Sequence, residues 1–219
     1  MTITAIETRY AGHRFRSRLE ARWAVFLNTL GIAWEYEPQG YENRTFCDCD
    51  QPLFEGRRNC SGKHEHYLPD FWLPDTQTWV EVKGSEAALM EKASLYAEAI
   101  DFGGFLPHVT DSGYGSSRGL LVLGPIPRDY RPHTDHPVHS ILQHRKGVVR
   151  NWATFTAGAG ADVWAEGDRA SSAPDLPDPG EFPFTGIAAM DSRTTDYRLH
   201  RAYTAARTAR FEHGETPNT

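Results

Sequence analysis

The stretch PDFWLPDTQTWVEVK, residues 69–83, decides the fold of this chain. Two apolar runs flank a Pro-Asp-Thr-Gln segment, and two such runs around turn residues predict a β-hairpin. If the four turn residues close the hairpin symmetrically, Leu73 pairs with Thr78 and Asp70 stands opposite Glu81. The Cβ atoms of these two acids would then lie roughly 5 Å apart.

This register places two carboxylates and a lysine on one face of the hairpin. Because side chains alternate along a strand, Lys83 falls on the same face as Glu81. Two carboxylates this close repel each other unless a cation lies between them or one of them is protonated. The register therefore suggests a divalent metal site. The opposite face is expected to form the core side of a half-buried hairpin, with Tyr67, Phe71, Leu73, Val80 and Val82.

Apolar periodicity predicts the elements on either side of the hairpin. A glycine at position 31 follows the first helical pattern, where a helix C-cap is expected. A polar segment that contains all three cysteines interrupts the pattern at residues 40–65 and is interpreted as an insertion. The expected elements are, in order, a helix over 15–30, a strand over 32–38, the hairpin within 66–84, a helix over 86–100 and a strand over 119–126.

The chain beyond residue 127 gives weaker signals. A strand is expected around 148–156, and the proline-containing segment 166–183 is typical of a linker. Regularly spaced alanines predict a last helix over 196–211. We therefore divide the chain into a core over 10–127 and a C-terminal extension over 128–219. Imidazoles exposed on a helix or loop, rather than a metal site, are expected for His133, His136, His139 and His144.

Composition limits the classes of function. The 219 residues carry a formal net charge of −6, which is unfavourable for phosphate contacts, although net charge hides local basic clusters. No apolar run approaches the roughly 18 residues that a membrane span requires, and residues 1–10 lack the order of a signal peptide. We expect a cytoplasmic protein without membrane contact.

These motifs resemble the PD-(D/E)XK nuclease superfamily, whose core is the restriction-endonuclease-like αβββαβ fold. Pro69-Asp70 stands where the family has its PD pair, and Glu81-Val82-Lys83 stands where it has (D/E)XK. The resemblance implies an α/β protein that cuts DNA as a Mg²⁺- or Mn²⁺-dependent endonuclease. It also implies that Asp70, Glu81 and the Val82 carbonyl bind the metal, and that Lys83 is the catalytic lysine.

Glu20 has two interpretations. In the first helix it matches an additional acidic residue of the family, which implies an auxiliary metal ligand. The run Ser17-Arg18-Leu19-Glu20 is also a capping box, in which Ser17 caps the helix and Glu20 returns a bond to the Ser17 backbone N–H. Arg16 is a further candidate partner for the same carboxylate. The sequence leaves these roles open.

The helix after the lysine departs from one family pattern. Some exonuclease-like members carry Gln-x-x-x-Tyr at this place, and the present chain has Lys92-Ala-Ser-Leu-Tyr96. Lys92 is therefore either a phosphate contact or an ordinary solvent-facing lysine.

The cysteines suggest a second, structural site. Cys47, Cys49 and Cys60, together with His64 or His66, offer the thiolate and imidazole ligands of a tetrahedral Zn²⁺ site. Their spacing is irregular, so reduced free thiols are the competing interpretation. The alternative function is accordingly an inactive nuclease-fold module that binds nucleic acid or a protein partner and is stabilised by zinc.

Overall fold

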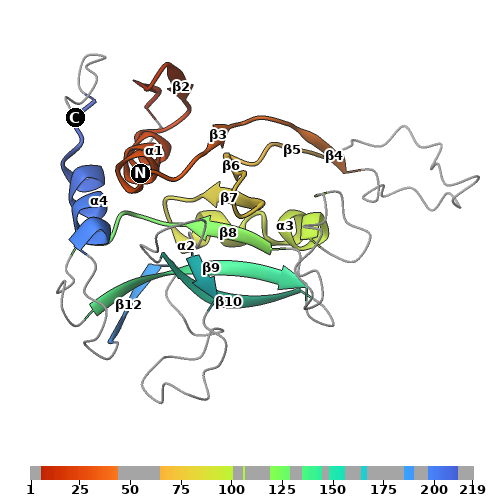
Figure 1. Ribbon diagram of the computed structural model, residues 1–219. Coiled ribbons are helices and arrows are strands. Elements are labelled where there is room, and N and C mark those ends of the chain that lie inside the picture. Colours follow the sequence, from red (N-terminus) through yellow and green to blue (C-terminus); the bar gives the residue numbers. More distant parts are fainter. Residues whose placement is uncertain are drawn as a thin grey trace, which may run out of the picture.

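The computed structural model describes residues 6–43, 65–100, 106, 119–128, 135–144, 148–155, 164–166, 185–189 and 197–211. These residues form a mixed α/β structure around one large sheet (Figure 1). The strands of this sheet are β3 (Glu35–Tyr36), β6 (Phe71–Leu73), β7 (Thr78–Val82), β8 (Gly119–Leu123), β9 (Asp135–His144), β10 (Val148–Phe155), β11 (Trp164–Glu166) and β12 (Thr185–Ala189). Their spatial order is β11-β10-β9-β8-β7-β6-β3, and β12 pairs with β9.

Four helices and two separate strand pairs complete the described structure. The helices are α1 (Arg18–Leu30), α2 (Glu86–Met90), α3 (Ala93–Ile100) and α4 (Tyr197–Thr208). The separate pairs are β1 (Thr8–Tyr10) with β2 (His13–Phe15), and β4 (Tyr41–Asn43) with β5 (Glu65–Tyr67). None of the helices in the described ranges is long and apolar enough to cross a bilayer.

The β6–β7 hairpin has the predicted register. Leu73 pairs with Thr78 and Phe71 pairs with Val80, and continuing this pairing by one residue places Asp70 opposite Glu81. On its other edge β7 pairs in parallel with β8, where Glu81 faces Val122. The strand that carries Glu81 is therefore an interior strand of the sheet.

The expectation of a half-buried hairpin is wrong, because every residue of β7 is buried. On one face, Phe71, Leu73, Val80 and Val82 pack into the larger core with α1 and α4, and these two helices lie side by side (Figure 1). On the other face, Trp79 packs into a second cluster with the buried residues of α3. Burial on both faces is typical of an interior strand that has a parallel neighbour.

Tyr67 was expected on the larger core face, and this expectation is also wrong. Its side chain belongs to the second cluster. Tyr67 lies in β5, which pairs with β4, and three residues of non-strand backbone separate it from β6. The alternation of side chains therefore does not continue from β6 back to Tyr67.

The first predicted helix is confirmed as α1, but it begins at Arg18, because Phe15 belongs to β2. Helix α1 ends at Gly31, whose φ of 75° is the left-handed conformation of a C-cap glycine. The helix expected over 86–100 is two helices, α2 and α3, with a turn at Glu91 and Lys92. The strand expected over 32–38 is only the two-residue β3.

The region beyond residue 127 takes part in the sheet. Strand β9 pairs with β8 as well as with β10, so the described strands of both halves of the chain form one sheet. The last helix is observed as α4, within the predicted limits. His139 is fully buried, which corrects the expectation that it is exposed, and His133 lies outside the described residues. Of the predicted linker, only Glu166 is described, at the end of β11.

Candidate active site

The residues singled out in the sequence come together at one cavity of about 300 Å³. Helix α1 contributes Glu20, the residue before β6 contributes Asp70, and β7 contributes Glu81 and Val82. Lys83 follows β7 directly. The other lining residues are Arg16, His66, Tyr67, Leu68, Lys92, Leu95 and Tyr96. The cavity therefore combines three acids with three strongly basic side chains.

Asp70 is almost completely buried, with 3% of its surface exposed. Its Oδ2 accepts a hydrogen bond from the Val82 backbone N–H at 2.6 Å, and its Oδ1 accepts one from Arg16 Nη2 at 2.6 Å. Burial and the nearby charges of Glu81 and Glu20 raise the pKa of Asp70 well above its usual range, although the Val82 N–H and Arg16 act against them. Burial is the largest of these causes, so the ionised form of Asp70 is disfavoured unless a cation joins the site.

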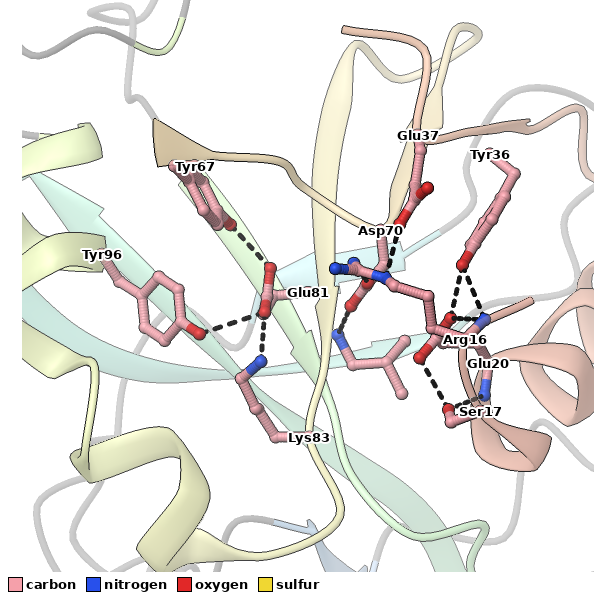
Figure 2. Close-up of polar contacts among 11 residues, drawn as sticks. Arg16, Ser17, Glu20, Tyr36, Glu37, Tyr67, Asp70, Glu81, Lys83 and Tyr96 are labelled. Atoms are coloured by element: carbon pink, nitrogen blue, oxygen red, sulfur yellow. Dashed lines mark hydrogen bonds and ion pairs between the residues drawn. The ribbon is translucent and has the colours of Figure 1, made fainter. Parts of the chain in front are cut away.

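Glu81 is equally buried and is held by a different set of donors (Figure 2). Tyr67 donates its hydroxyl to Oε2 at 2.9 Å, and Tyr96 donates its hydroxyl to Oε1 at 3.0 Å. Burial and the charge of Glu81 raise the pKa of both phenols above the ordinary tyrosine value. Both tyrosines therefore remain protonated donors that fix the Glu81 carboxylate in position.

Lys83 lies at the edge of the cavity beside Glu81. Its Nζ forms an ion pair with Glu81 Oε1 and lies 5.6 Å from the centroid of the Tyr96 ring. The Lys83 side chain is 21% exposed, and its backbone N–H donates to Leu123 O at 2.9 Å, which fastens the end of β7 to β8. A cation held at this position reaches both the acids and the solvent.

Glu20 shows the capping interaction, with a difference from the expected pattern. Ser17 Oγ accepts from the Glu20 N–H at 3.2 Å, which confirms Ser17 as the N-cap. The Glu20 carboxylate, which was expected to accept from the Ser17 backbone N–H, accepts instead from three other donors. These are the Ser17 hydroxyl at 2.6 Å, the Tyr36 hydroxyl at 2.6 Å and the Arg16 backbone N–H at 3.1 Å. Glu20 also borders the cavity, so its role as an auxiliary ligand remains a prediction.

The donor set suits a hard divalent cation. Mg²⁺ prefers oxygen ligands and needs only one or two protein carboxylates, because water and substrate phosphate fill its other positions. Asp70 and Glu81 supply such carboxylates in one cavity, and a cation bound there would offset the burial that raises the pKa of Asp70. Among the described residues, no group of three or more His, Cys, Asp or Glu side chains is arranged to hold a metal ion. Asp70 and Glu81, which share the cavity, are the two carboxylates that could hold such an ion.

Comparisons with protein-family models, with curated proteins and with solved structures find no match to this chain. The nuclease resemblance of residues 69–83 consequently stays an expectation drawn from the motifs themselves.

The predicted zinc ligands Cys47, Cys49, Cys60 and His64 lie outside the described residues. His66, the alternative ligand, is described and borders the cavity.

Three residues of the site were not predicted from the sequence. Tyr67 and Tyr96 bind Glu81, and Tyr36 binds Glu20. Tyrosine is the residue type that combines a large apolar ring with a hydroxyl that seeks a partner when buried. No local pattern in the sequence marks these three contacts, because each tyrosine lies 14 to 16 residues from the acid that it contacts.

Proposed function

We propose that this protein is a Mg²⁺-dependent deoxyribonuclease that hydrolyses internal phosphodiester bonds, built on a variant of the restriction-endonuclease-like core. The observation that carries the proposal is that two buried acids, Asp70 just before β6 and Glu81 on β7, share one cavity with Lys83. Burying two carboxylates side by side is unfavourable unless a cation joins them. A purely structural role would be served as well by apolar residues.

Each residue has a distinct task in this proposal. Asp70 and Glu81 offer oxygen ligands, and the Val82 N–H orients the Asp70 carboxylate. A bound divalent ion lowers the pKa of water and neutralises charge that develops on the phosphate. Lys83 places a positive charge where the attacking water and the phosphate oxygens meet, so that it can orient the first or stabilise the second.

The basic side chains of the cavity support a phosphate-containing substrate. Arg16, Lys83 and Lys92 line the same space as the acids, and guanidinium and ammonium groups are the usual partners of phosphate. Lys92 lies at the turn between α2 and α3, with an exposed side chain, where it can reach a phosphate next to the one that is cut. The choice of DNA and of internal cutting follows the family resemblance.

The test is a cleavage assay with Mg²⁺ or Mn²⁺ on supercoiled plasmid, linear duplex, single-stranded DNA and RNA. Wild type is expected to nick the plasmid, and a chelator is expected to stop it. Asp70→Ala and Lys83→Ala are expected to abolish cleavage, whereas Arg14→Ala, at an exposed ion pair with Glu7, is expected to retain it. Metal-dependent cleavage by both site variants would contradict the assignment. A wild type that is inactive on every substrate would favour the binding module instead.

A further inference from the structure

Arg16 places its guanidinium group beside Asp70, at the mouth of the cavity. Its Nη2 lies 2.6 Å from Asp70 Oδ1, and its Nε lies 2.6 Å from Glu37 Oε1. The Arg16 side chain is 55% exposed and the Asp70 side chain 4% exposed. The guanidinium therefore approaches the buried Asp70 carboxylate from the solvent side. Figure 2 shows it beside Asp70 and Glu37.

The two oxygens of Asp70 are not equivalent. Oδ2 accepts the Val82 N–H, a backbone contact that is fixed as long as β7 is folded. Oδ1 is the oxygen that remains for a cation, and Arg16 occupies it. A guanidinium group and a divalent ion carry charge of the same sign, so they cannot share this oxygen without strong repulsion.

We propose that Arg16 is a further functional residue with two alternative partners: it neutralises Asp70 while no metal ion is bound, and it contacts a substrate phosphate once a divalent ion takes its place. The inference rests on the proposed nuclease function and adds a substrate-binding residue to it. Both partners are negatively charged groups at the same cavity, so the exchange requires only a small movement of one side chain.

Glu37 holds one side of the Arg16 guanidinium while the other side changes partner. The Arg16 Nε pairs with Glu37 Oε1, which leaves the two Nη atoms to turn from Asp70 toward the cavity. Glu37 is itself fastened beside the site, because its backbone N–H donates to Asp70 O at 3.0 Å. A guanidinium held in this way presents paired donors that match the geometry of a phosphate group.

Arg14 offers a matched control two residues away. It forms an ion pair with Glu7 in which the two side chains are 65% and 61% exposed, and it is not among the residues that line the cavity. Substitution of Arg14 therefore removes the same charge from the same segment without touching the site.

The first experiment is a Mn²⁺ titration without nucleic acid, followed by the electron paramagnetic resonance signal of the free ion. Arg16→Gln is expected to bind Mn²⁺ roughly tenfold more tightly than wild type, because a competing charge is removed. Arg16→Lys keeps the charge and is expected to restore affinity toward wild type, and Arg14→Gln is expected to match wild type. Equal affinities in all proteins, weaker binding by Arg16→Gln, or no binding by any of them would overturn the inference.

The second experiment measures the affinity for a short DNA duplex against salt, with Mn²⁺ present and in a Lys83→Met background that suppresses turnover. Arg16→Gln is expected to reduce the slope of log K against log salt by about 0.9, the loss of one phosphate contact. Arg14→Gln is expected to leave the slope unchanged. An unchanged slope in Arg16→Gln would overturn the phosphate contact. A failed nuclease proposal would appear separately, as an inactive wild type in the cleavage assay, because both readouts here are binding measurements.

Discussion

Two buried polar regions contact helix α1, one through Glu20 and the other through Trp23, and they are built on opposite principles. In the cavity, Glu20, Asp70 and Glu81 gather negative charge beside Arg16 and Lys83. In the larger core, His139 lies among aromatic rings, and its Nε2 is 2.8 Å from the Tyr203 hydroxyl. Its ring centroid lies 5.2 Å from that of Trp23 and 5.5 Å from that of Phe155.

The difference lies in the charge that each region keeps in the folded protein. Burial lowers the pKa of His139 to about 3, so the imidazole is neutral and needs only a hydrogen-bond partner. Burial with other acids raises the pKa of Asp70, so its ionised form is disfavoured in the folded state. The His139–Tyr203 pair therefore needs no counter-ion, whereas the buried carboxylates of the cavity are expected to lower stability, which a functional role would explain.

The contrast between the two regions fails most clearly if cleavage does not need Lys83. Lys83→Met removes the charge beside Glu81 and is expected to lower the cleavage rate at least about 100-fold, the usual cost of losing a preorganised electrostatic contact. Its melting temperature is expected to fall, because buried Glu81 loses its ion-pair partner, so rates are compared at a temperature at which both proteins are folded. Cleavage and thermal unfolding of the same preparation check both statements. Full activity would remove Lys83 from the mechanism.

Tyr203→Phe probes the opposite region. The substitution leaves His139 Nε2 without the tyrosine hydroxyl in a buried setting, which is expected to cost about 1–3 kcal/mol of unfolding free energy. Cleavage by the folded protein is expected to be unchanged. Chemical denaturation measures the first quantity, and Tyr197→Phe on the exposed face of the same helix, where the side chain is 69% exposed, is the control. Lost activity without lost stability would contradict the division between the regions.

The dependence of stability on pH is expected to have opposite signs in the two regions. Between pH about 6.5 and about 3 the unfolded state protonates His139 and the folded state does not, so stability falls as pH falls. In His139→Gln, the free energy of unfolding is expected to fall less over this acidic range than it does in wild type. Folding raises the pKa of Asp70, so the contribution of Asp70 to the stability of the folded protein falls as pH rises.

Asp70→Asn is therefore expected to melt higher than wild type at neutral pH, with the gap narrowing in acid. One kcal/mol corresponds to about 2–4 °C in a protein of this size. Melting temperatures across the pH range, recorded for wild type and both variants, give the two signs. If the melting temperatures of all three proteins change with pH in parallel, neither His139 nor Asp70 titrates as described.

The smallest effect is expected at a hydrogen bond from an uncharged donor to Glu81. Tyr67→Phe removes one of the two phenols that orient Glu81, while Tyr96 and Lys83 keep their contacts with the same carboxylate. Because these two contacts still hold Glu81, only about 1 kcal/mol is expected to be lost, so cleavage is expected to fall about five-fold. Steady-state rates with saturating metal test this, and a loss as large as that of Lys83→Met would mean that Tyr67 acts in the chemistry directly.

The sequence predicts what is local and periodic. The pairing of Leu73 with Thr78, and hence the position of Asp70 opposite Glu81, follows from four turn residues and the alternation of side chains. The cap at Ser17 and the glycine at position 31 follow from equally local chemistry. This local information was enough to select Asp70, Glu81 and Lys83, which meet at the cavity.

Long-range packing could not be predicted from the same signals. Tyr67 was assigned to the wrong face because the chain leaves strand geometry between β5 and β6. His139 was expected to be exposed because nothing near it in sequence shows that β9 is covered by α1 and α4 through Trp23 and Tyr203. Arg16 meets Asp70 across 54 residues of chain, a contact that only the assembled sheet and helix create.

The central claim is that the buried carboxylates of Asp70 and Glu81 exist to hold a metal ion for phosphodiester cleavage. The most direct measurement is the rate of plasmid nicking against Mg²⁺ concentration for wild type and Glu81→Gln, with the melting temperature of each protein recorded alongside. We predict that wild type rises to a plateau, and that Glu81→Gln stays at least about 100-fold slower at every concentration while it melts no lower. Equal nicking by the two proteins, or nicking by wild type that does not depend on metal, would contradict the claim.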